Sequence, residues 1–141
     1  MLVDSHCHLN YPGLVEDEAG VLERARGRGV QGFLNISTRQ SEWGDVLAAA
    51  ERHSDVWAAI GVHPHEADKH PDLGSAALVE AATHPRVIAI GECGLDYYYD
   101  KSDRAAQRER FRAHIAAARE NGLPLVIHTR DAEEDTVAIL R

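Results

Sequence analysis

Histidines and acidic residues in this chain of 141 residues stand where short apolar runs end. Four such places share this character: DSHCH at residues 4–8, GVHPH at 61–65, GECGLD at 91–96 and HTRD at 128–131. Imidazole nitrogens and carboxylate oxygens together suit Zn²⁺, Mn²⁺ or Fe²⁺ as ligands. Metal chemistry is therefore open to these residues, provided that the fold brings them to one place.

His6 and His8 begin the candidate metal site. Two residues apart on a strand, their side chains point to the same face, which suits chelation of one ion. A lone HxH pair is more often structural or exposed, but Glu92 and His128 follow two other apolar runs and complete an N,N,O,N ligand set. A carboxylate among imidazoles also needs protonated partners or a cation to offset its desolvation. We therefore predict a divalent metal site made of these four residues.

Other polar residues near these positions each have two open interpretations. His63 and His65 flank Pro64 and either contact substrate or the surroundings of the metal, or simply form a rigid turn. Arg130 either clamps a phosphate or pairs on the surface with a neighbouring acid. The run Tyr97–Tyr99 offers rings for base stacking or for packing.

Elements that alternate between strand and helix would position these residues. Five apolar runs predict strands: Leu2–Val3, Val30–Ile36, Val56–Val62, Val87–Ile90 and Leu125–Ile127. Longer stretches between and after them predict helices: residues 16–28, 41–53, 75–84, 104–121 and from about 131. This order is typical of βα units around a parallel sheet. Ligand sites form at the carboxyl edge of such sheets, where the polar residues would meet.

Composition sets the protein class. A chain of 141 residues is enough for a single domain, residues 1–141, with a real core. The net charge of −8 opposes long-range attraction to phosphate backbones, so any nucleic-acid contact has to be local or metal-bridged. No run approaches the ~18 apolar residues of a membrane span and no signal peptide is recognisable, so we expect a cytoplasmic protein without a membrane partner. Cys7 and Cys93 have no CxxC spacing, and we expect reduced, core-filling thiols.

The order and spacing of these motifs resemble the TatD family of metal-dependent deoxyribonucleases, within the amidohydrolase-like TIM barrels. The matching stretches are VDSHCHL at 3–9, GVHPHEA at 61–67, IGECGLDYYYD at 90–100, QRERF at 107–111 and LPLVIHTRDAEEDT at 123–136. The resemblance implies an α/β fold, a TIM (β/α)8 barrel, of which the chain holds about the first five βα units.

The resemblance also implies roles for individual residues. It makes His6, His8, Glu92 and His128 metal ligands, with Glu92 bridging two divalent ions, which would be Mg²⁺, Mn²⁺ or Zn²⁺. Catalytic roles are expected for Glu92, Arg130, His63 and His65, and contacts with substrate for Arg130, Tyr97 and Tyr98. The implied activity is hydrolysis of DNA phosphodiester bonds through a metal-activated water.

The chain departs from the family pattern in its length. A complete barrel takes about 250 residues, and the later family elements, which carry a further His ligand and a catalytic Asp, have no counterpart here. We therefore expect the chain alone to be weakly active or inactive and its open strand edges to favour self-association. Two alternatives stay open: an esterase or amidase that uses the same ions, and a non-catalytic half-barrel completed by another chain.

Overall fold

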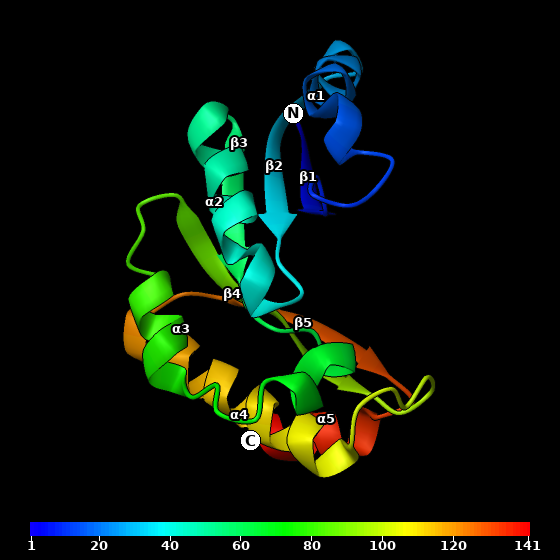
Figure 1. Cartoon of the computed structure of the whole chain (residues 1–141), viewed down its shortest axis with the longest axis vertical. Coiled ribbons are helices and arrows are strands. Elements are labelled where there is room, and N and C mark those ends of the chain that lie inside the picture. The colour runs from blue at the N-terminus through cyan, green and yellow to red at the C-terminus, as the bar shows by residue number, and fades with distance from the viewer.

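A computed structural model describes residues 1–141 and shows five parallel strands in one sheet, paired in chain order. The strands are β1 (Leu2–Cys7), β2 (Val30–Ile36), β3 (Val56–Ile60), β4 (Val87–Asp96) and β5 (Leu125–Arg130). The helices are α1 (Glu18–Gly27), α2 (Trp43–Arg52), α3 (Ser75–Ala81), α4 (Arg104–Asn121) and α5 (Glu133–Leu140). Short 3₁₀ helices are η1 (Val15–Asp17), η2 (Gln40–Glu42) and η3 (Pro64–Lys69). The sheet curls into a half-barrel, the expected incomplete form of a TIM barrel (Figure 1).

Helix α4 shows how local sequence sets an element's limits. Asp103 caps its amino end, where the carboxylate accepts the Ala106 N–H at 3.1 Å. Gly122 ends it in a left-handed conformation with φ of +68°, which glycine adopts without steric cost. Both ends of α4 agree with the sequence prediction, because both carry strong cap signals.

The main core lies between the sheet and the helices. Its cluster of 17 buried residues includes Leu22 of α1, Val46 of α2 and Leu78 of α3, which pack against apolar side chains of the strands. Phe33 and Ile60 are among the strand residues that meet them. Burial of these side chains fixes the helices on the sheet and so holds the strand ends in register.

Strands β4 and β5 run further than the apolar pattern predicts. Their ladder continues through polar residues, with Gly94 opposite His128 and Asp96 opposite Arg130. Gly94 has a φ of +129°, and a Cβ at this position would overlap the carbonyl oxygen of His128. The close approach therefore depends on glycine. Because the ladder continues past Ile90, Glu92 lies inside β4 instead of in the loop after it.

Strand β3 is shorter than predicted and ends at Ile60. The next two backbone N–H groups leave the ladder: Gly61 donates to the Ser37 hydroxyl at 2.9 Å, and Val62 donates to the His114 ring at 2.9 Å. Side chains thus replace strand pairing at this point, which turns the chain toward η3.

The two outer strands differ from the expectation that every strand is buried on both faces. Leu2 and Val3 of β1 are 59% and 61% exposed, and Ile127 of β5 is 39% exposed. Each of these strands has a single neighbour in the sheet, so one backbone edge stays unpaired.

No helix has both the length and the apolar character needed to cross a membrane. Both cysteines are free thiols, half-buried at Cys7 and buried at Cys93, as predicted.

Candidate metal centre

The polar strand ends meet at one edge of the sheet, as the sequence predicts. They line an open cavity of about 630 Å³ into which side chains from β1, β4 and the segment after β3 project. The candidate residues on its wall are His6, His8, His63, His65 and Glu92.

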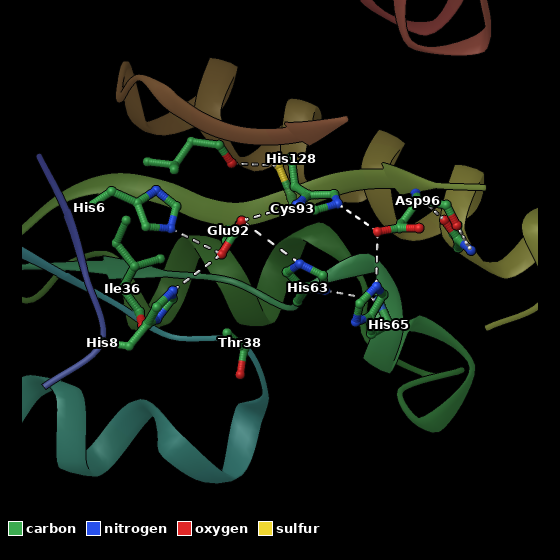
Figure 2. A network of polar contacts seen from close by, with 12 residues as sticks. His6, His8, Ile36, Thr38, His63, His65, Glu92, Cys93, Asp96 and His128 are labelled. Atoms are coloured by element: carbon green, nitrogen blue, oxygen red, sulfur yellow. Dashed lines mark hydrogen bonds and ion pairs between the residues drawn. The ribbon is translucent and has the colours of Figure 1, made fainter. Parts of the chain in front are cut away.

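Glu92 occupies the centre of this group (Figure 2). Its Oε2 lies 3.3 Å from His6 Nε2 and 3.6 Å from His8 Nε2. Its Oε1 lies 3.4 Å from His128 Nδ1 and 3.8 Å from His63 Nε2. Each oxygen of one carboxylate therefore faces a different pair of imidazoles.

The tautomer of His8 follows from its hydrogen bond. His8 Nδ1 lies 2.8 Å from the carbonyl oxygen of Ile36, and a carbonyl can only accept, so Nδ1 carries the proton. In the neutral ring Nε2 then presents a lone pair toward Glu92. Tyr11 stacks on the ring, 4.6 Å away between centroids and 13° between planes, and fixes its orientation. Two acceptors that face each other at 3.6 Å form a stable pair when a cation lies between them.

Asp96 orients a second imidazole, that of His128, from the side of the ring away from Glu92. Its Oδ2 lies 2.8 Å from His128 Nε2 and 3.0 Å from His65 Nε2, while its Oδ1 accepts the Tyr99 N–H at 2.8 Å. Burial alone would raise the pKa of Asp96, but these hydrogen bonds outweigh it and lower the pKa to about 2. The ionised carboxylate can only accept, so His128 carries its proton on Nε2. In the neutral ring the Nδ1 of His128 then presents its lone pair to Glu92.

The electrostatics of the site favour a bound cation. Burial acts to raise the pKa of Glu92, but a hydrogen bond from His128 in its protonated form and the nearby imidazoles lower it below its usual value. His128 responds in the opposite direction, since Glu92 raises its pKa. Burial lowers the pKa of His63 to about 4, which keeps that ring neutral near pH 7. In their neutral forms His8 and His128 thus turn lone pairs toward the ionised Glu92, whereas the ionised Asp96 accepts the N–H groups of His65 and His128.

The structure sorts the candidate ligands differently from the sequence. One group with metal-ligand spacing is His6, His8 and Glu92, three of the four residues that the sequence predicts as ligands. The other contains His128 together with His63 and His65, instead of His128 with the first group. Because Glu92 contacts both groups, its carboxylate lies between them, with His6 and His8 on one side and His128 on the other.

Comparison with known protein families identifies the family of this chain. A family model described as TatD related DNase matches residues 3–141. The chain belongs to the TatD-related DNase family. The resemblance of its motifs to this family is thereby confirmed.

Several known proteins align with this chain over nearly its whole length. The uncharacterized metal-dependent hydrolase YabD of Bacillus subtilis is 40% identical over 141 residues, which cover 100% of this chain and 55% of YabD. The 3'-5' ssDNA/RNA exonuclease TatD of Enterobacter lignolyticus is 37% identical over 139 residues, which cover 99% of this chain and 54% of the relative. The crystal structure of YjjV, a TatD homologue from Escherichia coli K12, superposes with a TM-score of 0.91 at 30% identity and covers 99% of this chain and 54% of YjjV. The chain spans about half the length of these relatives.

The other residues of this TatD-family chain that are predicted to bind substrate, Arg130, Tyr97 and Tyr98, are held by different contacts. The Arg130 guanidinium lies over the rings of Tyr98 and Tyr99, 4.1 and 4.8 Å from their centroids, and makes no ion pair with a neighbouring acid. Tyr97 is directed elsewhere, since its hydroxyl donates to Asp135 of α5 at 2.5 Å. The structure thus brings Arg130 and Tyr98 together and places Tyr97 against the helices.

His63 and His65 combine both interpretations of their motif. The His65 N–H donates to His63 Nδ1 at 3.0 Å, which closes a turn at the start of η3. The two rings also face the cavity, 4.3 Å apart between centroids. The motif is therefore a structural turn that also delivers imidazoles to the site.

The sequence analysis did not identify Asp96, Tyr11 or the positively charged side chains on the rim of the cavity, here called the rim cations. Asp96 had a usable signal, because it lies four residues after Glu92 and a strand's period of two puts both on one face. Tyr11 had none, since it belongs to the loop after β1. The rim cations Arg39, Lys69 and Lys101 come from three separate loops and short helices.

Proposed function

We propose that this TatD-family chain binds two divalent cations, one on each side of Glu92, and hydrolyses phosphodiester bonds of single-stranded nucleic acid. The observation that carries the proposal is the Glu92 carboxylate, whose two oxygens face separate groups of imidazoles. Relatives named as 3'-5' ssDNA/RNA exonucleases support the choice of substrate. When bound, such ions polarise a phosphoryl oxygen and lower the pKa of a water molecule.

The chain's own residues would hold these ions through fixed lone pairs. His8 presents Nε2 because Ile36 holds the proton on Nδ1, and His128 presents Nδ1 because Asp96 holds the proton on Nε2. His6 and Glu92 complete the two sets. Ligands rich in imidazole favour Mn²⁺ or Zn²⁺ over Mg²⁺.

Arg130 and the tyrosines beside it would bind the nucleic acid. The rings of Tyr98 and Tyr99 cover a face of the guanidinium, so the N–H groups along its edge stay available for a phosphate. Tyr98 and Tyr99 are 57% and 52% exposed, which leaves ring surface for a stacked base. The rim cations would offset locally the repulsion expected from a net charge of −8.

The test measures metal binding and cleavage separately. Titration calorimetry with Mn²⁺ on the purified chain should show two bound ions, and Glu92→Gln should abolish tight binding of both. A single-stranded oligonucleotide should be cleaved only with metal, slowly, and not by Glu92→Gln or in EDTA. Absence of Mn²⁺ binding, or cleavage that persists in EDTA, would refute the proposal.

A substrate panel separates the alternatives that share these ions. Turnover of a carboxylic ester with no turnover of a phosphodiester would favour an esterase. Stoichiometric metal binding without turnover of either substrate would favour a half-barrel that another chain completes.

A further inference from the structure

His63 differs chemically from the imidazoles around it. Its Nδ1 accepts the His65 N–H at 3.0 Å, so this nitrogen carries no proton while the bond is formed. The single proton of the ring is therefore on Nε2. His128 has its proton on Nε2 as well, but turns that atom away to Asp96 and presents its bare Nδ1 to Glu92.

The proton-bearing nitrogen of His63 points into the site. Nε2 lies 3.8 Å from Glu92 Oε1, which is beyond a normal hydrogen bond, and it has no other partner. A metal ligand needs a free lone pair, and this nitrogen has none. His63 is thus a hydrogen-bond donor without an acceptor, although it lies within ligand distance of His65 and His128.

The surroundings hold this donor in one orientation. The His63 side chain is 12% exposed, and its ring packs edge-on against His65 and His128, with centroids 4.3 and 4.5 Å away. Pro64 restricts the backbone on one side, and the buried His114 ring fixes Val62 on the other. A donor that is fixed before substrate binds is the arrangement that stabilises developing negative charge most effectively.

We propose that His63 is not a metal ligand and that its Nε2–H donates a hydrogen bond to a phosphoryl oxygen of the substrate. The proposal rests on the proposed function, since it assumes that phosphate enters the site beside Glu92. It accounts for a proton-bearing nitrogen 3.8 Å from the carboxylate oxygen that also faces His128. A negatively charged oxygen bound there would be the missing acceptor.

The experiment compares His63 with a residue that is proposed to hold metal. Mn²⁺ titrations of His63→Ala and His63→Gln should give dissociation constants within about twofold of the parent chain, whereas His8→Ala should weaken binding tenfold or more. Inorganic phosphate should bind the Mn²⁺-loaded His63→Ala chain about tenfold more weakly or worse, because a hydrogen bond to a charged group is lost. His63→Gln should restore part of this affinity through its amide N–H. Circular dichroism and thermal unfolding check that each variant folds.

A second readout needs neither metal nor activity. Nitrogen-15 NMR of the metal-free chain should show His63 with its proton on Nε2. A proton on Nδ1, a loss of Mn²⁺ affinity in His63→Ala equal to that in His8→Ala, or unchanged phosphate affinity would each overturn the inference. Absence of Mn²⁺ binding by the parent chain would instead overturn the proposed function, and the NMR result together with phosphate titration of the metal-free chain would still decide the role of His63.

Discussion

Protonation of the buried His114 should destabilise the fold. His114 Nδ1 lies 2.7 Å from the Arg110 carbonyl oxygen, and Nε2 accepts the Val62 N–H at 2.9 Å. Both ring nitrogens are therefore committed, and a second proton would break the bond to Val62 and bury a charge. Burial accordingly lowers the pKa of His114 from 6.5 to about 4.

The magnitude follows from the two pKa values. An unfolded chain takes up this proton near pH 6.5, whereas the folded chain resists it until about pH 4. The stability contributed by the neutral ring is thus complete above the unfolded pKa and is lost as the pH falls through the folded pKa. The gap is worth about 3 kcal/mol at most, and about 2–3 kcal/mol of it should disappear between roughly pH 7.5 and 4.5.

Urea unfolding at these two pH values tests this expectation. Fluorescence of Trp43 and Trp57 reports unfolding, and EDTA excludes bound metal. His114→Gln keeps an oxygen for the Val62 N–H but does not titrate, so its free energy of unfolding should depend on pH less than that of the parent chain, by about 2–3 kcal/mol. His84→Gln is the matched control. Equal pH dependence in His114→Gln and the parent chain would refute the reasoning.

Three further perturbations have definite expected outcomes. Asp96→Asn should weaken Mn²⁺ binding about 10- to 100-fold in calorimetry, because its single amide oxygen cannot accept both from the Tyr99 N–H and from the His128 ring whose tautomer it fixes, and an unchanged affinity would contradict this role. Gly94→Ala should lower the midpoint of thermal unfolding, since its Cβ would overlap the His128 carbonyl oxygen, whereas Gly44→Ala, where nothing lies within 4 Å, should not. Sedimentation velocity should show association that grows with concentration and weakens in a Val3→Lys variant, because β1 has an exposed apolar edge, and a monomer at every concentration would exclude it.

Much of the fold could be predicted from the sequence because strong local signals coincide. Alternating apolar runs and helical stretches predict the five βα units, and the predicted limits of the helix over residues 104–121 agree with those of α4. Strand ends were harder to predict, because β4 and β5 extend through polar residues whose pairing depends on the neighbouring strand. Apolar character marks what is buried and not where a ladder stops.

The candidate site shows a similar division. Strand periodicity and the shared edge of a parallel sheet are enough to predict that His6, His8, Glu92 and His128 converge. Which ring nitrogen carries a proton depends on partners that are remote in sequence, such as Ile36 for His8 and an aspartate of β4 for His128. Such partners are fixed by tertiary packing, so no local pattern could have revealed them.

Asp96 connects two parts of the sheet that do not touch along their backbones. Strands β3 and β5 lie on opposite sides of β4, yet one carboxylate oxygen accepts from His65, which follows β3, and from His128 in β5. A change in either ring alters the share of that oxygen left to the other, so substitutions of the two histidines should not act additively. A change in the segment after β3 can in this way alter how firmly the imidazole of β5 is held.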